Sequence, residues 1–444
     1  MDVDELPVVV VGAGPAGLAA AAQAVARGLP VVVLEAGPSA GTGVREWHHV
    51  RLFSRWGEVV APAAEELLAP TGWRIPDAGS CPTGAEWAES YLQPLADVLG
   101  DRVRYGARVV GVSRHGWDRS VDRARDTEPL SVRVVTADGE ERILARAVID
   151  ASGTWSAPNP LGGDGLPALG ETAAADRITH RVPDLTDPAV RRRYAGRRIA
   201  LAGSGHSALT ALVAFAELAE QHPDTHVQWL LRRGAVGTTF GGGDADQLPA
   251  RGALGMRAAQ AVRAGRITTV TGFRTARVDR TDDGRVVLSS FGDRRLGPVD
   301  EVVALTGFRP DLSWLSEVRL DLDPTLQAPR ELAPLIDPNV HSCGTVHPHG
   351  ARELAQPEPG LFLVGMKSYG RAPTFLALTG YEQTRSVVAA IAGDRDAADR
   401  VELVLPETGV CGGAGLVDAP GDDAGGCCGP AEPLVVGTRP SAAG

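Results

Sequence analysis

A strand, glycine turn, helix and strand follow one another at the start of the chain and limit its fold more than any other feature. A short apolar run at residues 7–11 leads into GAGPAG, an Ala-rich segment continues to about Arg27, and a second apolar run at residues 31–34 ends in Glu35. Runs of this length are typical of buried parallel strands. The pattern predicts an α/β fold that begins with a dinucleotide-binding unit.

Each position of this turn has a physical role in holding a dinucleotide. Gly12 allows the tight turn, Gly14 lets the backbone approach a pyrophosphate, and Gly17 allows the helix to pack closely on the strand. A carboxylate at Glu35 is placed to accept a hydrogen bond from a ribose hydroxyl, which suits the ADP half of FAD at least as well as NAD. The alternative is a Gly-rich turn in an ordinary α/β protein. The predicted contacts are Gly12, Gly14, Pro15, Ala16, Gly17 and Glu35.

The same order of elements recurs near the middle of the chain. A strand at residues 199–202 precedes GSGHSA, a helix at 208–220 follows, and a strand at 227–231 ends in two arginines rather than an acid. An acid would repel the 2′-phosphate of NADP, whereas guanidinium groups pair with it, so this unit predicts NADPH. The alternative is a structural unit with surface arginines. The predicted contacts are Gly203, Ser204, Gly205, His206, Ser207, Arg232 and Arg233.

A nicotinamide site beside a flavin site predicts transfer of hydride from NADPH to FAD. Further strands are expected at residues 147–153, at 299–307 and before Gly365, with a helix at 380–392. This order resembles the flavoproteins with two dinucleotide-binding domains. The resemblance implies two Rossmann-like domains, with Gly153, Gly365 and Met366 on the FAD side. The expected divisions are a discontinuous FAD domain (6–160 and 305–395), an inserted NADPH domain (161–304) and a flexible Cys-containing tail (396–444).

Within that superfamily the chain resembles the flavin-containing monooxygenases. The segment REWHHVRLFSRW (residues 45–56) looks like their aromatic stretch near the flavin, although their linker signature is not intact around Leu169, Gly170 and His180. The CxxC and CxxxxC pairs of the related reductases are absent from the sequence. A closer resemblance is to the flavin monooxygenase-like proteins of bacterial arsenic-resistance operons, in VGMKSYGRAPTFLALTGYEQTRSV and in the Cys-containing tail.

The resemblance implies an NADPH- and FAD-dependent monooxygenase that oxidises a soft nucleophile, sulfur or trivalent arsenic, through a flavin hydroperoxide. Its partners would be oxygen and a small-molecule substrate. One alternative is an NADPH-dependent flavin reductase that passes electrons to thiols or a metalloid through the tail cysteines. Another is a non-enzymatic NADPH/FAD sensor or metalloid-binding protein. Lys367, the only lysine, is predicted to lie in a loop near the flavin and to stabilise its reduced anion, unless it is simply solvated.

Two groups of cysteines and histidines could hold a soft metal or metalloid. HSCGTVHPHG contains His341, Cys343, His347 and His349, but the spacing fits no standard zinc finger, and a loop on the substrate side is preferred. The tail is too poor in large apolar groups to pack, so it predicts a mobile arm. Its thiols suit trivalent arsenic, although a disordered end without function is the alternative. These thiols belong to Cys411, Cys427 and Cys428.

Charge and apolar content bear on location and partners. A net charge of −11 argues against nucleic acid or an anionic membrane as a partner. No stretch approaches the ~20 apolar residues of a membrane helix, and the acidic start does not resemble a signal peptide. Five cysteines do not make a disulfide framework in a chain of this size. These features predict a cytoplasmic protein.

Overall fold

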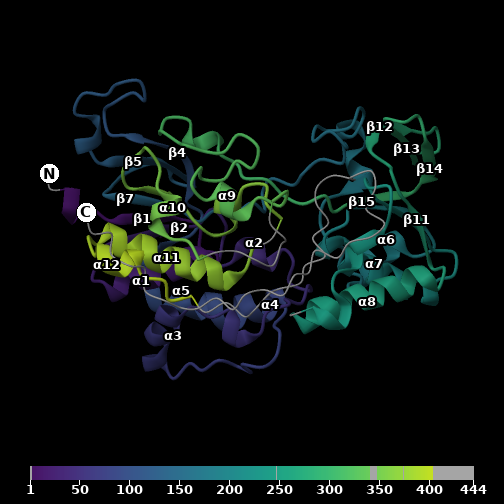
Figure 1. Ribbon diagram of the computed structural model, residues 1–444, viewed down its shortest axis with the longest axis horizontal. Helices are drawn as coiled ribbons and strands as arrows, with labels where there is room; N and C mark the ends of the chain where they lie inside the picture. Colours follow the sequence, from purple (N-terminus) through teal and green to yellow (C-terminus); the bar gives the residue numbers. More distant parts are fainter. Residues whose placement is uncertain (1–2, 247, 341–347, 374, 404–444) are drawn as a thin grey trace.

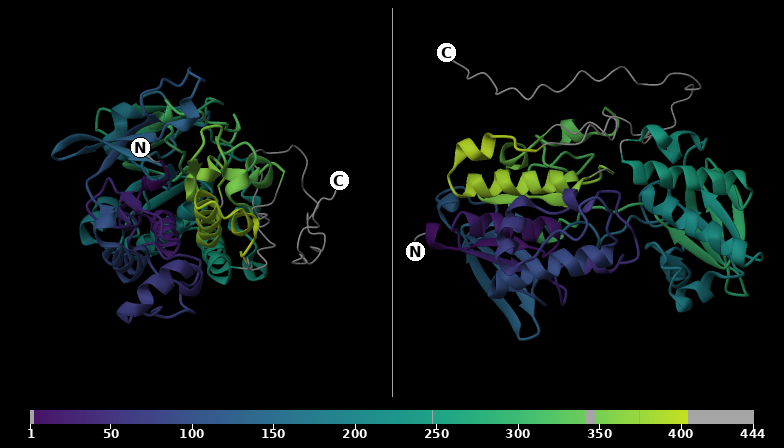
Figure 2. Two further views of the ribbon diagram at one scale, coloured as in Figure 1. Left: turned by 90° about the vertical axis from the view of Figure 1, so that its left-hand side faces the viewer. Right: turned by 90° about the horizontal axis from the view of Figure 1, so that it is seen from below.

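The computed structural model describes residues 3–246, 248–340, 348–373 and 375–403, which form two lobes (Figure 1). Each lobe contains a five-stranded parallel sheet. The view from below places the lobes at opposite ends of the molecule (Figure 2). The α/β fold with two Rossmann-like units, predicted from the repeated glycine turns, is therefore confirmed.

The sheet of the first lobe combines segments from both ends of the chain. Its strand order is β16-β7-β1-β2-β3, and all neighbouring strands are parallel. The apolar runs on either side of the first glycine turn form its adjacent strands β1 and β2. The bounds are β1 (Val8–Val11), β2 (Val31–Leu34), β3 (Val103–Arg104), β7 (Ala147–Asp150) and β16 (Leu361–Leu363).

Helices cover one face of this sheet and a small antiparallel sheet covers the other. Along β1, Val8 and Val10 pack against the helices, while Val9 and Val11 pack against the antiparallel sheet. Successive side chains of a strand point to opposite faces, so a run of valines is buried on both sides. The helices are α1 (Pro15–Ala26), α3 (Pro62–Leu68), α5 (Gln93–Leu99) and α11 (Ala377–Ile391), and the antiparallel strands are β4 (Arg108–Arg114), β5 (Leu130–Thr136) and β6 (Gly139–Ala145).

The second lobe repeats this arrangement of three layers. Leu201 of its sheet packs against helices, and the adjacent Ala200 packs against a second antiparallel sheet. The parallel strands, in spatial order, are β11 (Ile267–Val270), β10 (His226–Leu230), β9 (Arg198–Ala202), β15 (Glu301–Ala304) and β8 (Ile178–Thr179). The covering elements are α7 (His206–Gln221), α8 (Pro249–Arg263), β12 (Thr275–Arg280), β13 (Val286–Ser290) and β14 (Arg295–Val299).

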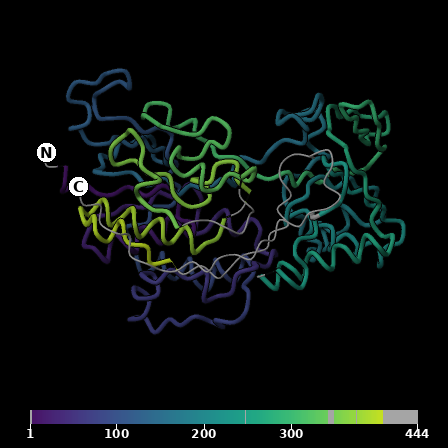
Figure 3. The backbone as a smooth tube through the Cα atoms, viewed as in Figure 1, coloured from purple at the N-terminus to yellow at the C-terminus, as the bar shows by residue number. Residues whose placement is uncertain are grey.

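Two segments of the chain connect the lobes, and they pair with each other (Figure 3). Pro158, on the way to the second lobe, forms an antiparallel bridge with Phe308, on the way back. The backbone N–H of Asn159 donates to the carbonyl of Gly307 over 2.8 Å. Shorter helices lie around this connection and at the edges of the lobes. They are α2 (Thr42–Arg45), α4 (Gly84–Trp87), α6 (Pro188–Tyr194), α9 (Ala333–Ile336), α10 (Ala351–Leu354) and α12 (Arg395–Asp399).

The sequence predictions agree closely with the elements around the two glycine turns. The strand bounds differ by at most one residue at each end for β1, β2, β9 and β10, while α7 begins at His206, two residues before the expected start. The segment after β16 forms a short 3-10 helix over Gly365–Tyr369 instead of an open loop. The domain limits at residues 160, 304 and 395 remain predictions.

Candidate functional site

The first glycine turn connects β1 to α1 and leaves space in front of the helix. Gly12 has a φ of +100°, and a Cβ there would lie 2.9 Å from the carbonyl oxygen of Ala151. A Cβ at Gly17 would lie 1.9 Å from the carbonyl oxygen of Gly12, so the helix packs where only glycine fits. A Cβ at Gly14 would meet nothing within 4 Å. This open position at a helix N-terminus fits the pyrophosphate of a dinucleotide.

Glu35 braces the same turn from the end of β2. Its carboxylate accepts hydrogen bonds from the backbone N–H groups of Ala13 and Gly37, each over 2.8 Å. The acid therefore ties the glycine turn to the segment that follows β2. Carboxylate oxygens have further acceptor positions, so these bonds are compatible with the predicted contact to a ribose hydroxyl. That contact remains a prediction.

The second glycine turn has the same geometry between β9 and α7. Gly203 has a φ of +133°, and a Cβ there would lie 2.2 Å from the carbonyl oxygen of Leu305. A Cβ at Gly205 would meet nothing within 4 Å, as at Gly14. Ala208 replaces the third glycine and is fully buried. Ser204, His206 and Ser207 are solvent-accessible around this turn. The second turn therefore also fits a pyrophosphate.

Arg232 and Arg233 directly follow the carboxyl end of β10, where the sequence predicts recognition of the 2′-phosphate. Arg232 is exposed, and Arg233 is partly buried. The backbone carbonyl of Arg233 accepts a hydrogen bond from Gly272 N–H, which fixes the position of this turn. The arrangement allows a phosphate to reach Arg232 from solvent. The preference for NADPH over NADH remains a prediction.

Replacing both arginines with alanine tests that preference. We expect the Michaelis constant for NADPH to rise by roughly tenfold to hundredfold, since one charge-assisted bond contributes about 1.5–3 kcal/mol. The constant for NADH should change little, because NADH lacks the 2′-phosphate. Steady-state NADPH and NADH oxidation by the same preparations measures both. Equal losses for the two cofactors would contradict the assignment.

Lys367 lies in the 3-10 helix after β16 and is not solvated. Its side chain is 1% exposed, and its Nζ forms an ion pair with Asp150 Oδ2 at 2.7 Å. The same Nζ donates to Ser152 Oγ over 3.0 Å. Asp150 in turn accepts hydrogen bonds from the N–H and hydroxyl of Ser152 through Oδ1. This lysine therefore joins the segment after β16 to the turn after β7. Its role beside a reduced flavin remains a prediction.

Gly365 places the end of β16 next to the start of α1. It has a φ of +67°, and a Cβ there would lie 2.9 Å from the Cβ of Ala16. Its N–H donates to Gln383 Oε1 over 2.7 Å. The structure therefore brings Gly365 and Ala16 together, while their contact with FAD remains a prediction. Gly153, with a φ of +68°, lies in the turn after β7, and the half-buried Met366 follows Gly365.

Gln383 of α11 organises a buried polar network that sequence reasoning missed. Its amide nitrogen lies 2.9 Å from Ser368 Oγ and 2.7 Å from His349 Nε2. Ser368 Oγ donates to the carbonyl of Gly365 over 2.8 Å. A signal was present in the YEQTRS sequence, where polar residues interrupt a buried helix. His349 is thus a buried partner of α11. His341, Cys343 and His347 lie outside the described residues.

The segment at residues 45–56 reaches the second lobe. The ring of Phe53 lies 5.1 Å from the ring of His206 in an edge-to-face contact. Although His206 keeps solvent access, desolvation by its surroundings lowers its pKa, and Arg251 lowers it further. An uncharged imidazole therefore lies between this aromatic segment and the start of α7. The contact connects the predicted flavin side to the predicted nicotinamide side.

The cysteines fall into two groups with respect to the structure. Cys81 is partly buried, and its Sγ lies 3.6 Å from the carbonyl oxygen of Phe53. Burial, followed by the charge of Glu58, raises the pKa of this thiol, which argues against an activated nucleophile. The predicted metalloid ligands lie outside the described residues. They are Cys411, Cys427 and Cys428.

The matching family agrees with this geometry. A sequence model of the pyridine nucleotide-disulphide oxidoreductase family matches residues 6–357, so the chain belongs to this family. It is an FAD-dependent oxidoreductase that uses a pyridine nucleotide. The open positions at Gly14 and Gly205 fit the two dinucleotides. In the part of the chain that the structure describes, no helix is long and apolar enough to cross a membrane.

Individual relatives include both monooxygenases and reductases. The chain is 28% identical over 202 residues to indole-3-pyruvate monooxygenase YUCCA1 of Oryza sativa subsp. japonica. The matched residues are 45% of this chain and 43% of that protein. It spans less than half the length of the curated relatives that it matches.

Two solved structures share the fold over almost their whole length. One is the bacillithiol disulfide reductase of Bacillus cereus, with a TM-score of 0.64 and 18% identity over 87% of this chain and 99% of that one. The other is the FAD-bound cadaverine monooxygenase of the Erwinia amylovora desferrioxamine pathway, with a TM-score of 0.63 and 15% identity over 92% and 98%. At these identities the likeness shows the fold alone.

Proposed function

We propose that the protein is an NADPH-dependent FAD monooxygenase that oxidises a soft nucleophile, either a trivalent arsenical or a sulfur compound. The distribution of cysteines carries this proposal. They occur at positions 81, 343, 411, 427 and 428, so no CxxC or CxxxxC pair accompanies either glycine turn. Such a dithiol passes electrons onward in thioredoxin- and glutathione-reductase-like enzymes, so its absence favours another electron acceptor. The monooxygenase named among the relatives supports oxygen as the acceptor.

The chain supplies binding and orientation for this reaction. When bound, FAD accepts hydride from NADPH and supplies the oxygen chemistry. The backbone N–H groups in front of α1 hold the first pyrophosphate, and those in front of α7 hold the second. The ion pair between Lys367 and Asp150 fixes the two turns that flank the first site. The contact between Phe53 and His206 joins the segment at residues 45–56 to the start of α7.

The preference for a soft nucleophile is supported by the resemblance to arsenic-operon flavoproteins in the segment around Gly365 and in the thiol-containing tail. Thiolates match trivalent arsenic by the same soft–soft preference that pairs them with copper(I). A tail of this composition could carry a bound metalloid to the flavin lobe. The proposed role is therefore detoxification of trivalent arsenic by oxidation.

The FAD-loaded protein tests the reaction type directly. We expect arsenite, phenylarsenite or a thioether to stimulate NADPH oxidation under isotopically labelled oxygen, with one labelled oxygen atom in each oxidised product. Mass spectrometry of the product measures that incorporation. Anaerobic NADPH-driven reduction of a disulfide, without labelled product, would instead support the flavin reductase. Failure to oxidise NADPH with any acceptor would support a sensor.

Replacing the three tail cysteines with serine tests the carrier role. The variant should bind FAD and reduce it with NADPH as the unmodified protein does, because both glycine turns are intact. Its affinity for trivalent arsenicals should fall, since serine lacks the soft ligand that arsenic prefers. Equilibrium binding of phenylarsenite measures this change, and Cys81→Ser is the matched control. Unchanged binding and turnover in the tail variant would show that the tail is not a carrier.

A further inference from the structure

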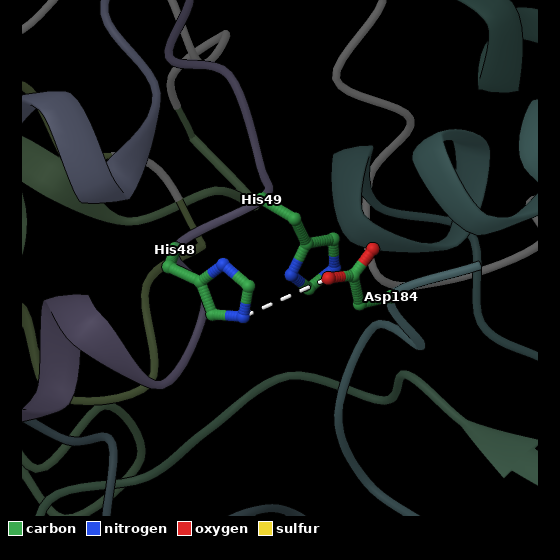
Figure 4. Close-up of side chains that lie close together, drawn as sticks. All are labelled: His48, His49 and Asp184. Carbon is green, nitrogen blue, oxygen red and sulfur yellow. Dashed lines mark ion pairs between the residues drawn. The ribbon is translucent and has the colours of Figure 1, made fainter. Parts of the chain in front are cut away.

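Two histidines and an aspartate from different lobes meet beside the connection between the lobes (Figure 4). His48 and His49 follow α2 in the first lobe, and Asp184 precedes α6 in the second. One nitrogen of each histidine and one carboxylate oxygen all lie within 4.8 Å of one another. His48 Nε2 lies 3.7 Å from Asp184 Oδ2. Nothing in the local sequence indicates this group, because His49 and Asp184 lie 135 positions apart in the chain.

The backbone around each side chain belongs firmly to its own lobe. The carbonyl of His48 accepts a hydrogen bond from Ala85 N–H over 2.9 Å, and the preceding Trp47 packs against the core of the first lobe. On the other side, Leu185 packs against the helical core of the second lobe. A ligand held by the three side chains would therefore connect the two lobes.

Asp184 presents one of its oxygens to the histidines. Its Oδ1 accepts hydrogen bonds from the N–H of Thr186 over 2.9 Å and from its hydroxyl over 2.5 Å. These bonds leave Oδ2 directed toward His48, as Figure 4 shows.

The imidazole ring of His49 is a buried polar group without a well-aligned hydrogen bond in the described part of the chain. Both ring nitrogens are buried, and within the described residues neither makes a well-aligned hydrogen bond, although the backbone of Val182 interacts with the ring. A buried polar group without a partner costs about 1–3 kcal/mol and calls for a ligand or water. Imidazole nitrogen is also a common ligand of metal ions.

We propose that His48, His49 and Asp184 form a binding site for Zn²⁺ or a similar divalent transition metal that links the two lobes. Imidazole nitrogen and carboxylate oxygen are zinc ligands, and three protein ligands leave a fourth position for water. Bond lengths of about 2.0–2.2 Å in a tetrahedral site place ligand atoms roughly 3.4 Å apart. The observed 3.7 Å between His48 Nε2 and Asp184 Oδ2 is close to that separation, and all three ligand atoms lie within 4.8 Å of one another, so side-chain rotations would complete the site.

The surroundings show how such a metal would act on the protein. Trp155 Nε1 donates to Glu46 Oε2 over 2.6 Å, and the guanidinium of Arg181 lies 4.0 Å from the ring of Trp155. These contacts already join the lobes next to the three ligands. A bound metal would further restrain the relative orientation of the lobes. The rate at which NADPH reduces FAD would then respond to the metal, whatever the final substrate is.

Calorimetric titration with Zn²⁺ tests the site in the full-length, FAD-loaded protein. The thiols are first blocked with iodoacetamide, so that the cysteines do not compete for the metal. We expect one site that weakens by more than about 100-fold in His49→Ala and in Asp184→Asn, because removal of even an outer-shell partner costs roughly 10–100-fold. His226→Ala removes an exposed histidine of the second lobe and should leave the affinity unchanged.

His48→Ala guards against a variant that fails to fold. The side chain of His48 is 54% exposed, so its removal should leave the FAD content and the melting temperature of the metal-free protein intact. Zn²⁺ should raise the melting temperature of the unmodified protein but not that of His48→Ala, since only a bound metal stabilises the folded state. Absence of Zn²⁺ binding in the unmodified protein, or equal binding in all three ligand variants, would overturn the proposal.

Discussion

Gly14→Val should give a folded protein that purifies without FAD. Gly14 has a φ of −80° and a ψ of −175°, a conformation that valine adopts without strain. A Cβ there would meet no protein atom within 4 Å, so the added side chain occupies only the space in which the pyrophosphate would lie. Loss of two charge-assisted bonds to phosphate corresponds to about 3–6 kcal/mol, or a decrease in FAD affinity of roughly 100-fold or more.

Gly205→Val is the matched control for this substitution. Its backbone is also extended, with a φ of −83° and a ψ of 178°, and its Cβ would likewise meet nothing within 4 Å. This variant should keep its yellow FAD but lose reduction by NADPH. Flavin absorbance after desalting and circular dichroism measure cofactor content and folding. Full flavin content in Gly14→Val would refute the assignment of FAD to the first site. Loss of FAD in Gly205→Val would contradict the assignment of the second site to the nicotinamide cofactor.

The two glycine turns were predictable because their requirements are local. Gly12 and Gly203 need a positive φ, and each lies within a few residues of the strand and helix that it joins. The apolar runs that form β1 and β9 identify the buried sheets in the same local way. A single sequence therefore predicts the part of the site that binds the shared phosphates of both cofactors. It does so without information about contacts between distant residues.

The parts of the site that the sequence did not predict depend on contacts between residues far apart in the chain. Lys367 was expected beside a flavin or in solvent, but its partner Asp150 lies 217 residues earlier. Gln383 and His349 are in contact although α10, β16 and the 3-10 helix at Gly365–Tyr369 lie between them in the sequence. Nothing in the local pattern around either residue specifies these pairs. The fold decides which polar side chains are buried together, and only then does their chemistry follow.

The segment between β4 and β5 also makes contacts that its local sequence does not predict, and these contacts bear on stability. Its polar, aperiodic sequence predicts a surface insertion, yet Arg125 is fully buried. The reason is Glu358, which is also fully buried and accepts hydrogen bonds from Arg114 Nε over 2.6 Å and from Arg125 Nη1 over 2.8 Å. The N–H of Arg319 donates to the other carboxylate oxygen over 3.0 Å. One glutamate therefore holds this insertion against the main body of the first lobe.

Glu358→Ala should strongly destabilise the first lobe. It leaves the guanidinium groups of Arg114 and Arg125 buried without their counter-charge, and breaking a buried pair in this way costs about 3–5 kcal/mol. The melting temperature should fall on the order of 10 °C. Glu141→Ala is the control, because its ion pair with Arg104 leaves both side chains 37% exposed and contributes less than about 1 kcal/mol.

The melting-temperature difference between the unmodified protein and Glu358→Ala should depend on pH, and this dependence tests whether the charge of Glu358 causes the difference. Burial raises the pKa of Glu358, but the bonds from Arg125, Arg319 and Arg114 outweigh it and hold the pKa below the usual value. A pKa that is lower in the folded state gives stabilisation that is complete above the unfolded value of about 4.3 and is lost as the pH falls through the folded pKa. The melting difference between the unmodified protein and Glu358→Ala should therefore be largest near neutral pH and shrink in acid. A difference that stays constant from neutral to acidic pH would show that lost packing, rather than the ion pairs, destabilises the variant.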